Sequence, residues 1–325
     1  MSNDAHFEHA RTSQGLDSGR GHGGRIGQGE AMTRNYPNIT PPNDLRLPDA
    51  LTIKHGPRAL LARFVLEGDK LARTMGIRLR LRHDFKNFLT LNEFEVARGN
   101  WYPLVDIFQP EHGGLSPENA YWISGETDDG EIVVTQAGRV YYWPETSLAD
   151  EARDMFYGGR TDPKGPCIVK AADASKITGV VFFGGAVWVR PDFRGLGLSH
   201  LMPRLGRAYA TARWPIDWGI SLVKPALVDK GVAKGYGYKH ESRSLFFPGH
   251  QLGDLEVVLV YISRDEAYED LATFLTDGIA GASATPAPAV VRAGARAAVA
   301  PSVTKEETVT RISEDLVAQG SRSRS

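Results

Sequence analysis

The sequence predicts a mixed α/β sheet, and three observations lead to that fold class. Apolar spacing that suits strands alternates with helical spacing between residues 57 and 277. The segments follow in the order β, α, α, β, β, α, β, α, β, α, β, β, which differs from the regular alternation of a doubly wound sheet. Near the middle, KITGVVFFGGAVWV is a nearly continuous apolar run, as expected of a strand that is buried on both faces. We therefore expect one folded unit built around a mixed sheet.

The first half of this unit should hold a strand, one or two helices, a hairpin and a further helix. Residues 76–85, GIRLRLRHDF, alternate like a strand, and KNFLTLNEFEVARGNWYPLVDIF has helical spacing. The segments AYWISGE and EIVVTQAGRVYYWP have the pattern of strands and are separated by a turn at residues 128–130. ADEARDMFYGG has helical spacing that ends at paired glycines. This pattern predicts a hairpin between helical segments.

The second half continues from the central strand into alternating helices and strands. A helix is expected from Gly197 to about Arg213, followed by a strand in WGISLV and a short helix over residues 226–234. YKHESRSLFF and LEVVLVYIS follow as closing strands, and DEAYEDLATFL follows as a trailing helix. Pro203 lies among the apolar positions of the first of these helices, where an interior proline costs about 3 kcal/mol. We expect that helix to be kinked or to begin late.

Both ends of the chain differ from the folded unit in composition. Residues 1–56 are rich in Gly, Asn, Asp, Arg and Pro and hold few large apolar residues, which is typical of a disordered leader. Residues 278–302 are rich in Ala, Pro and Gly and are interpreted as a linker. Residues 303–325 begin with a capping-box spacing at Thr304 and Glu307. We expect a short amphipathic helix and a polar tail there, docked on the core, on a protein partner or on nothing.

Charge and cysteine content exclude several classes of protein. The 325 residues carry a net charge of −1 and a pI near 6.8, whereas a dedicated nucleic-acid binder needs a concentrated basic surface. The single cysteine, Cys167, forms no internal disulfide, which favours a reducing compartment, the cytoplasm. The N-terminus has no apolar signal segment, and no run of about 18 apolar residues spans a bilayer. We expect neither nucleic acid nor membrane as a partner, and the oligomeric state stays open.

The most informative segment is AVWVRPDFRGLGLSHLMPRLGRAYA, in which a strand ends at Val189 and a glycine turn leads into a helix. Gly195 and Gly197 lack Cβ atoms, so backbone N–H groups there can face outward at the positive end of the helix. That arrangement binds phosphate groups, and Arg194 adds a charged donor. A turn without a ligand is the simpler interpretation of a bare G-x-G. His200 at the third glycine position excludes the dinucleotide fingerprint.

The longer string VRPDFRGLGLSHLM resembles motif A of the GCN5-related N-acetyltransferase (GNAT) superfamily. Ser199 stands where that family usually has Gly or Ala, which is a mild departure because Ser is small. GVAKGYGYKH is similar to the end of the family's motif B, and the order of the elements is similar as well. The resemblance covers roughly residues 77–264 and neither tail. The positions that match motif A are Val189, Pro191, Arg194, Gly195, Gly197 and Leu201.

The resemblance implies a GNAT-like acyltransferase domain over residues 57–277. Such a domain transfers an acetyl or other acyl group from acyl-CoA to the amine of a small molecule or peptide, without a metal. The pyrophosphate of acetyl-CoA would lie on the glycine turn, and the pantetheine arm would pair with the end of the preceding strand. That strand and WGISLV would splay apart to admit the thioester. The cofactor-binding residues implied in this way are Val187, Trp188, Val189, Arg194, Gly195, Leu196, Gly197, Leu198 and Ser199.

The catalytic residues of the family are not in their usual places. GVVFFGGAVWV has no acidic residue, so the glutamate base of some members is missing. The tyrosine acid of many members would fall at Ala233 or Gly231, depending on which Gly-Tyr pair is aligned. Tyr236, Tyr238 and Glu241 are the candidate substitutes, although packed tyrosines and solvent-facing glutamates are the commoner case. Two alternatives stay open: a catalytically impaired GNAT-fold binding or assembly module, and an unrelated α/β scaffold.

An aromatic group formed by Trp101, Tyr102 and Phe108 precedes the hairpin. These side chains are core residues, which is the commoner case, or they form a cage around the acceptor. A cage of this kind would select a bulky or apolar acceptor.

Overall fold

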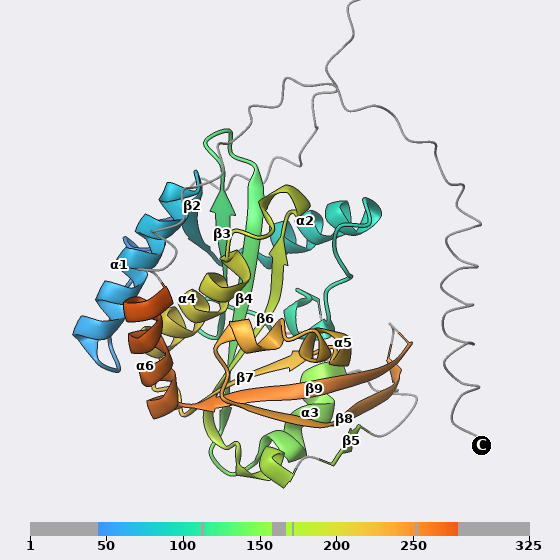
Figure 1. Cartoon of the computed structure of the whole chain (residues 1–325). Coiled ribbons are helices and arrows are strands. Elements are labelled where there is room, and N and C mark those ends of the chain that lie inside the picture. Colours follow the sequence, from blue (N-terminus) through green and yellow to red (C-terminus); the bar gives the residue numbers. More distant parts are fainter. Residues whose placement is uncertain (1–44, 112–113, 158–166, 171, 251–252, 279–325) are drawn as a thin grey trace, which may run out of the picture. The chain divides into compact units, whose positions relative to one another are not determined.

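The structure is a computed structural model that describes residues 45–111, 114–157, 167–170, 172–250 and 253–278 (Figure 1). Residues 1–44 of the expected leader, all but the first residue of the expected linker 278–302, and the expected helix over residues 303–325 lie outside this part. No helix of the described part is both long and apolar enough to cross a membrane.

In the described part of the chain, nine strands form one mixed sheet in the order β1-β2-β3-β4-β6-β7-β9-β8-β5. Among the described strands, β6 and β7 are the one parallel pair of neighbours, and the other pairs are antiparallel. The mixed α/β fold class predicted from the sequence is thereby confirmed. The strands are β1 Leu45–Arg46, β2 Arg78–Arg82, β3 Ala120–Glu126, β4 Ile132–Trp143, β5 Ile168–Val169, β6 Gly179–Val189, β7 Trp218–Val223, β8 His240–His250 and β9 Gly253–Ser263.

Helices of very different length connect these strands. The α-helices are α1 Arg58–Thr74, α2 Phe85–Ala97, α3 Leu148–Tyr157, α4 Leu198–Arg213, α5 Pro225–Asp229 and α6 Arg264–Thr273. Short 3-10 helices are η1 Asp106–Phe108, η2 Ala172–Lys176, η3 Pro191–Phe193 and η4 Ala233–Tyr236, and a π-helical turn, η5 Phe274–Gly278, follows α6. Helices α1, α4 and α6 pack beside one another (Figure 1).

Adjacent residues of β6 point to opposite faces of the sheet, as the pleat requires. Phe182 belongs to the core cluster that contains Phe64 of α1 and Leu205 of α4. Phe183 instead packs against Phe108 of η1, with their ring centroids 5.7 Å apart. The sheet therefore has an α4 face and an η1 face, and the candidate site uses both.

Several predicted elements have clear local causes in the structure. The β3–β4 hairpin turns at Gly130, whose φ of 80° favours glycine. Helix α2 begins after Asp84, whose carboxylate accepts hydrogen bonds from the amides of Lys86 and Asn87 at 3.0 and 3.2 Å. The predicted strand WGISLV coincides with β7. The turn and cap residues thus fix where these strands and helices begin and end.

Other elements differ from the prediction. Helix α1 is not among the elements predicted from the sequence, and its buried residues include Leu61, Phe64 and Val65. The folded part begins before residue 57, since β1 pairs with β2 and Leu47 is fully buried. Burial of an apolar side chain such as Leu47 stabilises the folded state, even though the residues around it in the sequence are mostly polar.

Of the two helices around the glycine motifs, α4 spans Leu198–Arg213 and confirms the expected helix from Gly197 to about Arg213. Pro203 lies in the interior of α4, beyond its first turn. The expected helix over residues 226–234 ends at Asp229 and is followed by η4. Gly231 has a φ of 73°, which lies outside the right-handed helical region and stops the helix.

Candidate functional site

The parallel strands β6 and β7 pair over only three residues each. Val181, Phe182 and Phe183 of β6 pair with Trp218, Gly219 and Ile220 of β7. Beyond this point β6 stays on β4 and β7 stays on β9, so the two central strands diverge. The divergence opens the sheet at the ends of both strands, as the resemblance implies.

A bulge lies in β6 within the divergent part. Gly185 pairs with Ala137 and Trp188 pairs with Thr135, so β6 has one residue more than β4 between these two pairs. Ala186, in the bulge, has a φ of 50°, the one positive φ at a non-glycine residue in the described part. The Thr135 hydroxyl donates to the Ala186 carbonyl at 3.0 Å and holds the bulge in place. The bulge therefore turns the end of β6 away from a regular ladder.

The glycine turn after β6, which we call the ligand turn (residues 194–199), leads into α4. Gly195 and Gly197 have φ values of 82° and 77°, and a Cβ atom at either would meet nothing within 4 Å. Within the described residues, the N–H groups of residues 195–199 have no hydrogen-bond acceptor. The exposed Arg194 guanidinium donates from Nε to the Val189 carbonyl at 3.2 Å. Such a row of unpaired donors at a helix N-terminus suits an anion.

A cavity of about 390 Å³ lies on the η1 face beside the divergent strands. Most of its side chains are apolar or aromatic, Ser221 and two tyrosines supply hydroxyls, and Lys224 is the one charged residue among the described residues that line it. The lining therefore offers no carboxylate or imidazole as a general base. The lining residues are Trp101, Tyr102, Pro103, Leu104, Val105, Phe108, Phe183, Gly185, Ala186, Val187, Ser221, Leu222, Val223, Lys224, Leu227, Tyr236, Leu255 and Val257.

The three candidate catalytic residues lie in different surroundings. Tyr236 lines the cavity, and burial raises the pKa of its hydroxyl above the ordinary value. Tyr238 is not part of the cavity, because its hydroxyl donates to the Ile220 carbonyl of β7 at 3.2 Å; burial raises its pKa also. Glu241 is exposed on β8 and does not line the cavity. The structure thus brings Tyr236 alone of these three to the cavity.

The candidate cofactor-binding residues of β6 also lie in different surroundings. Val187 lines the cavity, and Val189 pairs with Val134 of β4. Trp188 is buried and stacks on Trp101 with ring centroids 5.1 Å apart. This stacking makes Trp188 a support for the cavity wall rather than part of its surface.

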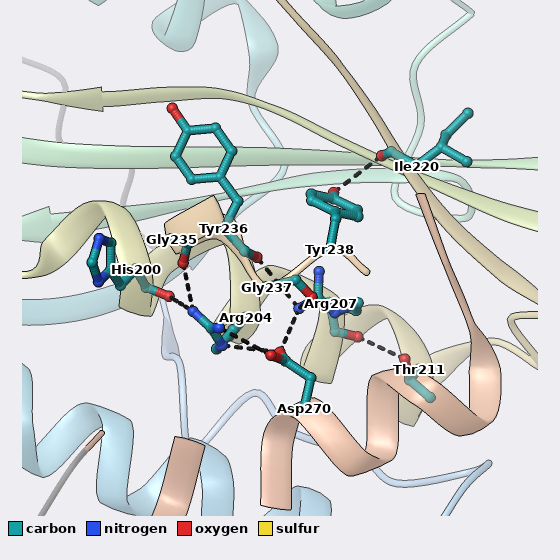
Figure 2. A network of polar contacts seen from close by, with 10 residues as sticks. All are labelled: His200, Arg204, Arg207, Thr211, Ile220, Gly235, Tyr236, Gly237, Tyr238 and Asp270. Atoms are coloured by element: carbon teal, nitrogen blue, oxygen red, sulfur yellow. Dashed lines mark hydrogen bonds and ion pairs between the residues drawn. The ribbon is translucent and has the colours of Figure 1, made fainter. Parts of the chain in front are cut away.

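A buried ion network that the sequence analysis does not predict lies on the α4 face (Figure 2). Arg204 donates to both oxygens of Asp270 through Nε and Nη2, each at 2.9 Å, and Arg207 donates to Oδ2 of Asp270, also at 2.9 Å. The exposed fractions of the three side chains are 10%, 9% and 1%, respectively, for Arg204, Asp270 and Arg207. The one hint in the sequence is the pair of arginines three residues apart in an otherwise apolar helix face.

The same arginines hold the loop before β8. Arg204 Nη1 donates to the Gly235 carbonyl at 2.6 Å and to the His200 carbonyl at 2.9 Å. Arg207 Nη2 donates to the Gly237 carbonyl at 3.2 Å. Figure 2 shows the ring of Tyr236 directed away from these ions. The network therefore fixes the backbone of the loop that carries Tyr236 to the cavity.

His200 connects the ligand turn with that loop. A Cβ atom at Gly235 would overlap the imidazole of His200, so the ring covers this glycine closely. Burial and then the charge of Arg204 lower the pKa of His200 below its ordinary value. The imidazole is therefore neutral at pH 7. No cluster of three or more His, Cys, Asp and Glu residues in the described part could hold a metal ion.

No protein-family model and no curated protein matches the sequence. Solved structures do match: Arabidopsis thaliana NAA60 in complex with acetyl-CoA is 12% identical, with a TM-score of 0.38 over 58% of this chain and 99% of its own. AAC(6′)-Ib in complex with parmomycin and acetyl-CoA is 14% identical, with a TM-score of 0.35 over 59% of this chain and 96% of its own. An uncharacterised Bacillus halodurans protein is 11% identical, with a TM-score of 0.39 over 62% and 93%.

Identities below 25% and TM-scores below 0.5 do not establish what this chain does. In its motif A string and in the strand divergence that follows from its own register, the chain is similar to GCN5-related N-acetyltransferases.

Proposed function

We propose that the chain is an acyl-CoA-dependent N-acyltransferase, which transfers an acetyl or other acyl group to the amine of an acceptor. The observation that carries the proposal is the ligand turn, whose unpaired N–H groups lie at the end of a strand that diverges from its parallel neighbour. A phosphate-binding turn beside an opening in a sheet is the arrangement that a long, phosphate-bearing substrate needs.

In this proposal the pyrophosphate of acyl-CoA binds the N–H groups of residues 195–199, and Arg194 adds a cation beside it. The pantetheine arm enters between β6 and β7 along the bulge at Ala186 and Val187. The thioester then meets the acceptor in the cavity on the η1 face. The two substrates thus approach the divergence from opposite faces of the sheet.

The reaction is a direct transfer. The neutral amine attacks the thioester carbonyl carbon, the C–N bond forms, and the C–S bond breaks. One proton of the amine leaves to solvent water, because no described lining residue is a carboxylate or imidazole, and the departing thiolate takes up one proton from a donor that water reprotonates. We assign the role of proton donor to Tyr236, because burial raises its pKa and keeps the hydroxyl protonated at neutral pH. Glu241, which is exposed outside the cavity, has no role in this scheme.

A second candidate function is a binding or assembly module that holds acyl-CoA without transfer. The observation that favours it is the cavity lining, whose described residues include no carboxylate or imidazole to accept the amine proton. In the transferase proposal, the described lining residues do not deprotonate the acceptor, so the ammonium form of the amine must lose its proton in solution before it binds.

The deciding experiment compares acetyl-CoA with acetyl-pantetheine, which lacks the pyrophosphate. We expect calorimetric titration to show acetyl-CoA binding at least tenfold more tightly, and Arg194→Ala to remove three- to tenfold of that affinity. Thiol release and mass detection of acylated amines then test turnover with an amine mixture.

Each outcome separates the candidates. Binding with amine-dependent thiol release supports the transferase. Binding without release by any amine supports the module. Equal binding of acetyl-CoA and acetyl-pantetheine would contradict the ligand turn as a phosphate site, and no binding of either would reject both functions.

A further inference from the structure

Lys224 lies at the point where β7 ends and the cavity wall begins. It is the N-cap residue of α5, and its side chain is exposed. Its ammonium nitrogen lies 3.7 Å from the centroid of the Tyr102 ring, which also lines the cavity. No carboxylate of the described residues forms an ion pair with it. The cavity therefore has one positive charge at its wall, held over an aromatic face.

The rest of the lining determines what this charge can select. Trp101, Phe108 and Phe183 are stacked or tilted against other aromatic rings, so the aromatic wall is built in advance of any ligand. An apolar cavity of about 150 Å³ accepts benzene. The volume of about 390 Å³ here therefore has room for an aromatic ring with a short polar arm.

Charge complementarity excludes the opposite class of acceptor. A polycationic amine would meet Lys224 without any lining carboxylate to neutralise it. A carboxylate on the acceptor would instead pair with the ammonium group while the apolar body covers the aromatic wall.

We propose that the acceptor is a primary amine that bears an aromatic or comparably apolar body and a carboxylate, and that Lys224 is the specificity-determining residue for the carboxylate. The inference rests on the proposed acyltransferase function. In this arrangement the carboxylate lies at Lys224, the apolar body lies against Trp101 and Phe108, and the amine is directed to the bulge at Ala186.

Binding is tested first, without any CoA chemistry. Because Trp101 lines the cavity, tryptophan fluorescence can follow titration with 3-phenylpropanoate and with 3-phenylpropan-1-ol, which has no charge. We expect the carboxylate to bind about fivefold more tightly than the alcohol at low salt. Lys224→Met should abolish this preference. Lys230→Met, at an exposed lysine of the same segment outside the cavity, should leave it unchanged.

Turnover is tested second with acetyl-CoA and two amines that differ only by the carboxylate, phenylalanine and 2-phenylethylamine. We expect kcat/KM to favour phenylalanine in the wild-type protein, and Lys224→Met to lower the ratio of the two values about fivefold. The two amines differ in basicity, but this difference affects the wild-type protein and Lys224→Met equally, so it cancels when the two ratios are compared.

The two tests fail in distinguishable ways. A carboxylate preference in the binding assay without acetyl-CoA binding would reject the transferase and sustain the anion-selecting role of Lys224. Acetyl-CoA binding with no preference for 3-phenylpropanoate, or a preference that survives in Lys224→Met, would overturn the acceptor assignment alone. Displacement of 3-phenylpropanoate by decanoyl-CoA but not by acetyl-CoA would overturn it too, since the cavity would then hold the acyl chain.

Discussion

Two glycine-containing turns lie at the start of α4, and their glycines are needed for opposite reasons. In the ligand turn (residues 194–199), a Cβ atom at Gly195 or Gly197 would meet open space. In the second turn, which we call the packed turn (residues 235–237), a Cβ atom at Gly235 would overlap the His200 ring. One at Gly237 would lie 2.5 Å from Oδ2 of Asp270. In the ligand turn, no described atom lies where a side chain would be, whereas in the packed turn other residues already fill that space.

The difference separates two requirements that a sequence motif cannot distinguish. Positive φ values at Gly195, Gly197 and Gly237 favour glycine in both turns. In the packed turn the protein itself occupies the space, so a substitution should cost folding stability. In the ligand turn no described atom occupies the space, and in the proposed function the phosphates of acyl-CoA lie there, so a substitution should cost affinity.

The largest effect is expected at the anchor of the packed turn. Asp270→Asn keeps the shape of the side chain but removes the charge that neutralises Arg204 and Arg207, which are both buried. Loss of one partner from a buried ion pair costs about 3–5 kcal/mol. We expect urea denaturation to show a loss of that size, while Glu269→Gln at the exposed neighbour should change little. A loss below about 1 kcal/mol would contradict a stabilising network.

Gly237→Ala should have the next largest effect. Strain from the φ of 77° costs about 1–2 kcal/mol, and overpacking against Arg204 and Asp270 adds about 1–3 kcal/mol. Gly231→Ala is the matched control, because its φ is 73° and its Cβ would meet nothing within 4 Å. Equal destabilisation of the two variants would show that crowding contributes nothing in the packed turn.

Gly235→Ala should cost less, about 1–2 kcal/mol, because the His200 side chain that it meets is exposed and able to move. In a double-mutant cycle, His200→Ala should recover most of the loss, since it removes the ring that occupies the space. Additive effects in the double variant would mean that the crowding arises elsewhere.

In the ligand turn, Gly197→Ala should lower the affinity for acetyl-CoA more than it lowers the stability of the fold. Backbone strain at the φ of 77° costs about 1–2 kcal/mol, as at Gly237, whereas we expect acetyl-CoA to bind at least tenfold more weakly, because the methyl group intrudes on the anion. Gly99→Ala has the same strain, at a φ of 71°, and no neighbour within 4 Å. It should match the stability loss and keep the affinity in calorimetry. Unchanged affinity in Gly197→Ala would remove the distinction between the turns.

The smallest effect is a titration of His200, which contacts both turns. Its pKa is lowered by burial and by Arg204, so NMR should find a midpoint below the ordinary value of about 6.5. The unfolded chain then binds a proton more readily, and the contribution of His200 to stability is lost as the pH falls from about 6.5 through the lower folded value. Bound acetyl-CoA should raise the midpoint. A midpoint at or above 6.5 in the free protein would contradict this.

The ligand turn could be predicted from the sequence because its causes are local. Arg194, Gly195 and Gly197 follow an apolar strand and precede an apolar helix, and each of these features is visible in the printed order of residues. The divergence of β6 from β7 was expected through the resemblance. The glycine pair Gly184 and Gly185 also predicts a bulge or a close approach in this strand, and the register shift beside Gly185 agrees with the bulge. The positive φ of Ala186 has no local signature.

The catalytic candidates could be proposed from the sequence but not ranked. Tyr236, Tyr238 and Glu241 are close along the chain, yet one lines the cavity, one is bound to Ile220, and one faces solvent. Tyr236 ends the 3-10 helix η4, Gly237 follows with a φ of 77°, and Tyr238 precedes β8, so no helical or strand periodicity relates the directions of the two rings. Their surroundings also come from β7, α4 and α6, which are distant in the chain.

The sequence by itself determined the mixed fold class, the ligand turn and most strands and helices, though not β1 or α1, because apolar periodicity and glycine positions act over a few residues. Only the tertiary structure decided that Asp270 joins Arg204 and Arg207, and that Lys224 is the one charged residue among the described residues that line the cavity. Which side chains are buried, which ion pairs form and which charged residue lines the cavity all depend on neighbours from distant segments. Those neighbours meet only when the chain has folded.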